Sequence, residues 1–197
     1  MSTIIDFFQF KRRGLGVPTL VLVDLHHDAS DLRAYSGNPA VVDALENCRA
    51  ALAHARANNF PVGFTRRVAP PESPTDTPSY PRWLKGFEPS RYDMIFERWR
   101  PSCYASTEFA EMAGYLGGDY VLAGQFAEMS CLSTAIDAFH RDHRPTFLSD
   151  ALVAHSAEDF SPAMMQHAVS HIVSLYADVV TTQSWRITTA RRVRVRE

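Results

Sequence analysis

Short apolar runs alternate with amphipathic stretches along most of the chain, and this alternation is its strongest structural signal. Residues 18–24 are apolar with little polar interruption before Asp24, which indicates a strand that is covered on both faces. Stretches with apolar residues every three or four positions predict helices between most of the strands. The pattern predicts a doubly wound α/β fold, with a six-stranded, mostly parallel sheet and helices on both faces. The further predicted strands are 61–66, 92–97, 119–124, 144–150 and 178–182.

Capping residues mark where the predicted helices begin. Asn38-Pro39 is an N-cap followed by a proline, and the helix that it opens runs to about Asn58. Ser106 or Thr107 opens a second helix, and Ser161-Pro162 opens another near the C-terminus. We expect Val42, Leu45, Cys48, Leu52 and Ala55 to face inward in the first helix, and Met164, Ala168, Leu175 and either His171 or Ile172 in the last.

The predicted elements fill residues 18–182 and define one domain. Residues 1–17 precede it as an N-terminal arm. Four large apolar side chains in this arm are expected to pack on the body or on a partner subunit, so we expect a homo-oligomer. Residues 183–197 form a basic C-terminal tail, which we expect to be solvated or part of an interface.

Composition and charge narrow the class of protein. The chain has 197 residues, a hydrophobic fraction of 46% and a formal net charge of −2, which are typical of one globular domain. This charge gives no electrostatic reason to expect nucleic acid or an anionic membrane as a partner. No apolar run is long enough to span a bilayer, and the first positive charges follow the apolar residues, the reverse of a secretory signal. Three cysteines without a paired spacing fit a reducing cytoplasm.

Polar side chains lie at the ends of three predicted strands. Asp24 ends the first strand, Arg98 follows the third, and Ser130 and Cys131 lie between the fourth strand and the next helix. The carboxyl ends of the strands share one edge of a doubly wound sheet, where ligands bind. We therefore expect a catalytic site there; the alternative is that each residue is only a helix cap, a surface ion pair or part of a turn.

A long segment without a regular period connects the second and third strands. Residues 67–91 are rich in Pro, Ser and Asp, and a loop of this length inside a compact domain is usually functional. Its aromatic residues Tyr80, Trp83 and Phe87 indicate a lid over a pocket.

These motifs, in this order, resemble the isochorismatase-like hydrolase superfamily, which includes isochorismatases, nicotinamidases and N-carbamoyl amidohydrolases. Residues 24–28, Asp-Leu-His-His-Asp, look like its opening Asp-x-Gln-x-Asp element. Residues 98–104 are similar to its Lys-x-x-x-Ser-Ala-Phe segment, and residues 124–139 look like its nucleophile turn and the following helix. The resemblance covers about residues 18–182. It implies a six-stranded parallel sheet and small-molecule hydrolysis by an Asp–Lys–Cys triad.

The lysine position of that triad is occupied by Arg98. A lysine can shift its pKa and take part in proton transfer, whereas a guanidinium stays charged and acts only as a donor and a fixed positive charge. Such a charge beside Asp24 favours the carboxylate, so we expect Asp24 to act as a base more readily than as an acid.

The nucleophile position also departs from the family pattern. In the amidohydrolases the nucleophilic Cys comes six residues after a Gly and four before a Thr. Counting from Gly124 and Thr134, both spacings reach Ser130 rather than Cys131. True isochorismatases resemble this chain here, because they carry a Gly at that position and form no covalent intermediate.

The first of three hypotheses is hydrolysis without a covalent intermediate. Asp24 would transfer the proton, Arg98 would stabilise an anion, and the turn N–H groups near Ser130 would bind an oxygen. Arg66 and Arg67 would bind a substrate carboxylate bidentately, or would be only a solvated pair of surface charges. The expected partner is a small polar or carboxylate-bearing substrate.

The second hypothesis is covalent hydrolysis of an amide or ureide. The Cys131 thiol is the better nucleophile but is displaced by one residue, whereas Ser130 has the right register and weaker chemistry. The third hypothesis is a ligand-binding protein that has lost catalysis. In each case the residues expected to line the substrate site are Trp83, Tyr104, Phe126 and Ala127.

We expect neither a metal nor another cofactor. After the second predicted strand the chain has no Asp-x-His element followed by a later His, the elements with which nicotinamidases hold their metal. His26, His27 and Asp28 are conceivable ligands, but the side chains of adjacent residues point apart. His167 and His171 lie one helical turn apart without a nearby carboxylate, so we expect them on a helix face.

Overall fold

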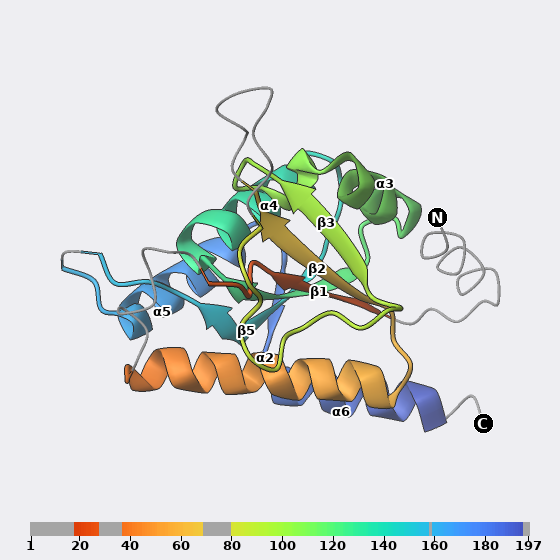
Figure 1. The fold of residues 1–197 in the computed structure, drawn as a ribbon, viewed down its shortest axis with the longest axis horizontal. Helices are drawn as coiled ribbons and strands as arrows, with labels where there is room; N and C mark the ends of the chain where they lie inside the picture. Colours follow the sequence, from red (N-terminus) through yellow and green to blue (C-terminus); the bar gives the residue numbers. More distant parts are fainter. Residues whose placement is uncertain (1–17, 28–36, 69–79, 158, 195–197) are drawn as a thin grey trace.

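The computed structural model describes residues 18–27, 37–68, 80–157 and 159–194, and it confirms the predicted fold class (Figure 1). Six strands form one parallel sheet in the order β3-β2-β1-β4-β5-β6. The chain builds outward in opposite directions from β1 and β4, so the carboxyl ends of these two strands flank the crevice where such sheets bind ligands. The strands are β1 Thr19–Val23, β2 Val62–Arg67, β3 Met94–Arg98, β4 Tyr120–Gln125, β5 Thr146–Val153 and β6 Asp178–Val180.

Helices cover both faces of the sheet and divide the core in two (Figure 1). The side chains of β1 alternate between these layers: Leu20 and Leu22 pack with one set of helices, and Val21 and Val23 with the other. All five residues of β1 are buried, which explains its continuous apolar sequence. One face carries α2 (Pro39–Ala57) and α6 (Thr182–Arg194), and the other carries α3 (Thr107–Tyr115), α4 (Leu132–Phe139) and α5 (Pro162–Val173).

The predicted helix starts are confirmed. Asn38 caps α2, Ser106 caps α3 and Ser161 caps α5, each by accepting a backbone N–H from the first turn on its side-chain oxygen. Pro39 and Pro162 occupy the first turns of α2 and α5, where a missing N–H leaves no hydrogen bond unmade. Within the described residues, no helix combines the length and the apolar character needed to cross a membrane.

Helix α5 turns a different face to the sheet from the predicted one. Val169 and Val173 are buried, whereas Met164, Ile172 and Leu175 are exposed. The helix carries apolar residues on more than one stripe, so its period alone does not identify the buried stripe. His171 is exposed as well, so the prediction that Met164, Leu175 and either His171 or Ile172 face inward was wrong.

The buried face of α2 also differs at its N-terminal end. Val41 and Ala44 are buried, while Val42, which was expected to face inward, is exposed. Cys48 is fully buried in the core, as predicted, and its thiol donates to the Ala151 carbonyl at 3.1 Å. The centre of the helix was thus placed correctly and its first turn was not.

The segment after β6 is part of the fold: of the two predictions for it, a solvated tail or an interface segment, the solvated tail was wrong. Helix α6 lies along α2 (Figure 1), and Trp185 is only 5% exposed. Its ring packs against the rings of His54 and Phe60, and Thr189 forms a hydrogen bond of 2.8 Å with His54. Few other residues of this segment are apolar, so hydrophobic periodicity gave little sign of the helix.

Part of the predicted lid lies on the chain that follows β1. Two backbone hydrogen bonds and an antiparallel bridge tie residues 82–84 to residues 25–27. Trp83 is half-buried in this contact. Phe87, in contrast, is fully buried in the core beside α2, which corrects its assignment to the lid. The predicted arm, residues 1–17, and the loop residues 69–79 lie outside the described residues.

Candidate active site

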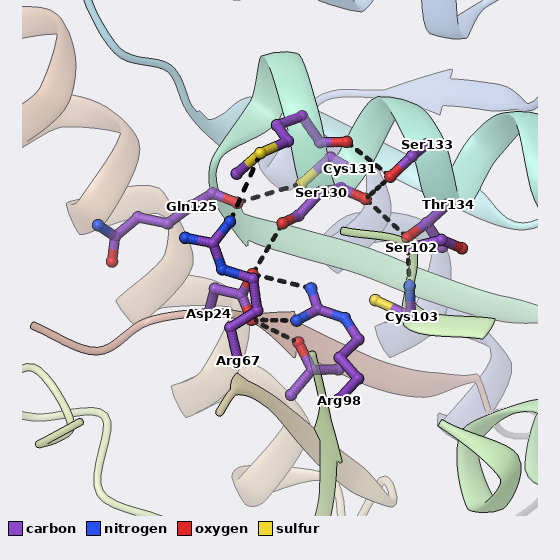
Figure 2. A network of polar contacts seen from close by, with 12 residues as sticks. Asp24, Arg67, Arg98, Ser102, Cys103, Gln125, Ser130, Cys131, Ser133 and Thr134 are labelled. Carbon is purple, nitrogen blue, oxygen red and sulfur yellow. Dashed lines mark hydrogen bonds and ion pairs between the residues drawn. The ribbon is translucent and has the colours of Figure 1, made fainter. Parts of the chain in front are cut away.

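Four side chains from neighbouring strand ends meet at the carboxyl edge of the sheet (Figure 2). Asp24 follows β1, Thr65 lies in β2, Arg98 ends β3, and Ser130 lies in the turn after β4. Asp24, Thr65 and Ser130 have no exposed surface, and Arg98 is 3% exposed. The structure thus brings together Asp24, Arg98 and Ser130, three of the four residues placed at this edge by the order of the chain; the fourth, Cys131, is described below.

Asp24 accepts four hydrogen bonds from these neighbours. Arg98 donates from its two terminal nitrogens to Oδ1 and Oδ2 at 3.0 and 2.8 Å. Thr65 Oγ1 donates to Oδ1 at 3.1 Å, and Ser130 Oγ donates to Oδ2 at 2.8 Å. Because both carboxylate oxygens accept from a guanidinium, neither carries a proton in this arrangement. Asp24 is therefore set to take up a proton rather than to give one.

Asp24 leaves the sheet in a conformation that residues with a side chain rarely adopt. Its φ is +53°, and its N–H still donates to the Thr65 carbonyl at 3.1 Å. Phe126, at the start of the turn after β4, also has a left-handed backbone, with φ +56°. Left-handed backbones at non-glycine residues are strained and concentrate at functional sites. Both strand ends that flank the crevice carry this strain.

Arg98 provides a fixed positive charge beneath the carboxylate. Burial works against its charged form, but the neighbouring Cys103 and Asp24 side chains outweigh burial and raise the pKa of the guanidinium above its ordinary value. Since the guanidinium cannot release its proton, Arg98 can act as a donor and as a charge but not as a proton carrier.

The turn after β4 depends on a close approach between two strands. A Cβ atom on Gly124 would lie 2.2 Å from the Val23 carbonyl oxygen, so only glycine lets β4 pass the end of β1 at this distance. Residues 127–131 then form one wide π-helical turn that leads into α4. Such turns are rare and occur often at functional sites.

This turn sends Ser130 and Cys131 to different places. Ser130 Oγ contacts Asp24, whereas Cys131 Sγ donates to the Gln125 carbonyl at 3.6 Å inside the core. Burial raises the pKa of the Cys131 thiol well above its ordinary value, and a protonated thiol is a poor nucleophile. Of the two candidates, the structure brings Ser130 to Asp24 and leaves Cys131 in the core.

The N–H groups of the turn do not have the predicted orientation toward a ligand. The N–H groups of Met129, Ser130 and Cys131 all point to the Phe126 carbonyl oxygen, at 3.0, 2.7 and 3.2 Å. A donor that is already bound inside the chain is not available for a substrate oxygen. The expectation that N–H groups around Ser130 form an oxyanion site is therefore wrong for these three groups.

Thr134, on the first turn of α4, connects the Ser130 turn to the segment after β3. Its hydroxyl donates to the Ser130 carbonyl at 2.7 Å and accepts the backbone N–H of Cys103 at 2.9 Å. Figure 2 shows Thr134 between the Ser130 turn and Cys103, and both Thr134 and Cys103 are fully buried. The hydroxyl thus fixes the turn that presents Ser130 relative to the segment that follows Arg98.

The two adjacent arginines at the end of β2 have different surroundings. Arg66 forms an ion pair with Glu97 and stacks on the rings of Tyr80 and Trp83. Arg67 lies over the Phe126 ring and donates to the Met129 sulfur at 3.5 Å, next to the Ser130 turn (Figure 2). Arg67 is therefore the arginine of this pair that lies beside the turn.

The remaining predicted lining residues divide into two groups. Phe126 is nearly buried and stacks on His155 with ring centroids 4.4 Å apart, and Trp83 packs edge-on against His26. Ala127 is fully buried in the core. Phe126 and Trp83 therefore lie next to residues of the site, whereas Ala127 is a packing residue.

Tyr104 is directed away from the site, contrary to the prediction. Its hydroxyl bonds to Tyr120 at 3.1 Å and to His143 Nδ1 at 2.7 Å. Tyr120 is the first residue of β4, so this cluster lies at the amino edge of the sheet. The 3-10 turn at Cys103–Ala105 sets this direction, and the hydrophobic pattern contains no signal for this turn.

His26 is a site residue that was considered only as a metal ligand. Its Nε2 lies 3.9 Å from Asp24 Oδ1 and accepts the backbone N–H of Arg67 at 3.4 Å. The side chain is almost completely buried. Its position two residues after the strand-end carboxylate was the signal that could have identified it.

Among the described residues, no group of three or more His, Cys, Asp or Glu side chains is arranged to hold a metal ion. His167 and His171 are exposed on α5, and Asp28 lies outside the described residues. Glu128 and His155 form a close pair, with Oε1 and Nδ1 2.6 Å apart, which the sequence did not suggest.

Comparison with known families agrees with the fold. Residues 18–184 match the Isochorismatase domain, and the chain belongs to this family. Over 138 residues it is 24% identical to enterobactin synthase component B of Escherichia coli, covering 61% of this chain and 47% of that protein. Over 97 residues it is 32% identical to the isochorismatase of Bacillus subtilis, covering 49% of this chain and 30% of that protein. The match thus spans less than half of the length of these relatives.

Solved structures show the same fold at lower sequence identity. A cysteine hydrolase from Pseudomonas syringae pv. phaseolicola superposes with a TM-score of 0.73 at 18% identity, covering 91% of this chain and 93% of that one. N-carbamoylsarcosine amidase from Thermoplasma acidophilum superposes with a TM-score of 0.61 at 20% identity, covering 84% and 96%. At these identities the likeness concerns the fold alone.

Proposed function

We propose that the protein is a hydrolase of the isochorismatase family that acts on a small, carboxylate-bearing molecule, with Asp24 as its proton-transfer group. The observation that carries this proposal is the buried Asp24 carboxylate, which accepts hydrogen bonds from Arg98, Thr65 and Ser130 at the crevice between β1 and β4. Family membership and the relatives named as isochorismatases support the reaction class.

The hydrogen bonds set the direction of proton transfer. Asp24 begins as a carboxylate, so it removes a proton from an attacking water and acts as a general base. Arg98 keeps its charge throughout and stabilises the negative charge that remains near Asp24. This order favours attack on an electron-poor carbon over initial protonation of an enol ether, which would need Asp24 to start as an acid.

Arg67 is the proposed anchor for the substrate carboxylate. Its guanidinium lies over Phe126 and beside the turn that carries Ser130, whereas Arg66 pairs with Glu97. A guanidinium can bind a carboxylate through two parallel hydrogen bonds, which fixes orientation as well as affinity. The position after β2 where nicotinamidases carry an Asp-x-His element has none in this sequence, which supports a reaction that needs no metal.

Turnover of a substrate panel by the Asp24→Asn variant tests this function. The panel contains carboxylate-bearing esters, amides, ureides and enol ethers. For any substrate that the wild type hydrolyses, we expect kcat/KM to fall by about 10²- to 10⁴-fold, because the base is lost. Asp137→Asn, which alters a surface pair with Arg141, is the matched control and should leave turnover unchanged.

Two outcomes would contradict the proposal. One is an Asp24→Asn variant that folds and has the same kcat/KM as the wild type. The other is thermal stabilisation of the wild type by several panel members without hydrolysis of any, which would indicate a ligand-binding protein.

A second candidate is covalent hydrolysis of an amide or ureide by Ser130. The contact of 2.8 Å between Ser130 Oγ and Asp24 Oδ2 favours it, since a nucleophilic hydroxyl needs a base within hydrogen-bonding reach. Both candidates use Asp24 as the base, and they differ in whether the Ser130 oxygen or water attacks the substrate.

A further inference from the structure

His26 changes the number of ionisable groups at the site relative to the family pattern. It occupies the Gln position of the Asp-x-Gln element, and glutamine does not titrate. Arg98 occupies the Lys position, and a guanidinium does not exchange its proton at ordinary pH. The site thus lacks the family's exchangeable amine and contains an imidazole instead.

The imidazole lies next to the carboxylate that the proposed function uses. Nε2 is 3.9 Å from Asp24 Oδ1, and the ring packs edge-on against Trp83 with centroids 6.3 Å apart. Nε2 also accepts the Arg67 N–H, so it carries no proton in this arrangement and can take one up. The ring is 2% exposed, which keeps bulk water away from the pair.

Charged groups reach His26 from three strand ends. Asp24 follows β1, Arg66 and Arg67 end β2, and Arg98 ends β3. Arg66 is paired with Glu97, and Arg98 is paired with Asp24. Within this set, Asp24 comes within ion-pairing distance of the imidazole, and a negative charge at that distance stabilises the protonated ring.

We propose that His26 is the proton-exchanging partner of Asp24. This inference rests on the proposed function. Asp24 takes a proton from the attacking water, the proton moves from Oδ1 to Nε2, and it returns through Asp24 to the atom that leaves the substrate. One water is added, one substrate bond breaks, and no proton is gained or lost overall. His26 acts through Asp24 and not on the substrate.

The transfer requires a small movement of the ring. A hydrogen bond between nitrogen and oxygen spans roughly 3 Å, so Nε2 must approach Oδ1 by roughly 1 Å from its present position. The movement separates Nε2 from the Arg67 N–H, and once protonated Nε2 can no longer accept that N–H and remains a donor to the carboxylate.

Histidine titration by NMR in the full chain tests the pairing without any substrate. The His26 ring signal is assigned by its absence in the His26→Gln variant. Removal of the carboxylate charge in Asp24→Asn should lower the titration midpoint of His26 by at least about one pH unit. His143, which bonds to Tyr104 at the other edge of the sheet, is the internal control and should not shift. An unchanged His26 midpoint, or a ring that does not titrate, overturns the proposal.

The pH dependence of kcat/KM provides a second test. Glutamine can still accept the Arg67 N–H, so His26→Gln should fold while losing the exchangeable proton. We expect a fall of at least about tenfold, together with loss of the acid limb that coincides with the His26 midpoint. A uniform fall with an unchanged pH profile would mean that His26 is only structural.

The two tests separate this inference from the proposed function. If Asp24→Asn retains turnover, the proposed function fails whatever the His26 titration shows. If Asp24→Asn loses turnover while His26→Gln keeps both its rate and its pH profile, only the role of His26 fails.

Discussion

Asp24 accepts four hydrogen bonds as a carboxylate, so one of these bonds has to give way before it can take up a proton. Arg98 occupies both carboxylate oxygens in a fork that a lysine ammonium could not form. Where the family resemblance expects a lysine, Arg98 thus gives both oxygens of Asp24 a hydrogen-bonded positive charge but no proton carrier. In the proposed function, chemistry at this site therefore begins with proton removal.

Substitution of Ser130 distinguishes direct attack by water from attack by the hydroxyl. In the isochorismatase branch a glycine occupies this position, so if water attacks, Ser130→Gly should retain kcat within about tenfold. If the hydroxyl attacks, turnover should fall by at least about 10³-fold and a substrate adduct seen by intact-mass analysis should disappear. Cys131→Ala is the matched control and should form the same products as the wild type, because its thiol lies in the core. Loss of activity in Cys131→Ala alone would contradict both mechanisms.

The sequence predicts site residues that lie at strand ends better than residues whose direction depends on an irregular turn. Asp24, Arg98 and Ser130 were predictable because strand order alone brings strand ends to one edge. Tyr104 and the turn N–H groups were not, since their directions depend on the dihedral angles of two irregular turns. His26 was missed because adjacent histidines first suggested metal ligation, whereas its carboxylate partner is two residues away in sequence.

At the scale of elements, the π-helical turn and α4 act as one unit that presents Ser130. The turn folds its own N–H groups onto the Phe126 carbonyl, and Thr134 ties it to the segment after β3. Local hydrogen bonds thus determine the path of the backbone in this turn, which the hydrophobic pattern of the sequence does not predict. This is why the start of α4 could be located from the sequence while the geometry before it could not.

Replacement of Thr134 by valine tests whether this unit positions Ser130. Valine keeps the shape but leaves the buried Cys103 N–H without its acceptor, so the free energy of unfolding should fall by about 1–3 kcal/mol. Turnover should fall as well, because the Ser130 turn loses a restraint. Ser133→Ala is the control: Ser133 also donates to the Ser130 carbonyl, at 3.3 Å, but is only half-buried, and its loss should change stability by less than about 1 kcal/mol. Urea unfolding measures the free energy of unfolding of the two variants. Equal stability of Thr134→Val and Ser133→Ala would contradict the positioning role of Thr134.

At the scale of the whole molecule, alternating apolar runs were sufficient to predict the doubly wound sheet. A strand buried on both faces must be apolar throughout, so β1 and β4 were readily recognised. Helix α6 was not predicted because, of its described residues, Trp185 is the one that belongs to the hydrophobic core. The buried face of α5 was predicted wrongly because the apolar residues of this helix occupy more than one stripe. These features depend on tertiary packing.

The sheet topology also explains why the site lies where it does. The chain order reverses between β1 and β4, which opens the edge between Asp24 and Ser130, while β2 and β3 supply Thr65 and Arg98 from one side. A buried ion pair is weak evidence for stability in itself, because desolvation offsets the attraction. Its position at the carboxyl edge, where the chain order reverses and doubly wound sheets bind ligands, fits the proposed role in chemistry.

A crystal structure of the Asp24→Asn variant with a hydrolysable substrate from the panel tests the central claim most directly. The account predicts that the reacting carbon lies within about 4 Å of the residue 24 side chain, with the water or Ser130 Oγ in line to attack. It also predicts the substrate carboxylate on Arg67. A substrate bound elsewhere, with Asp24, Arg98 and Ser130 still sealed from it, would contradict the account.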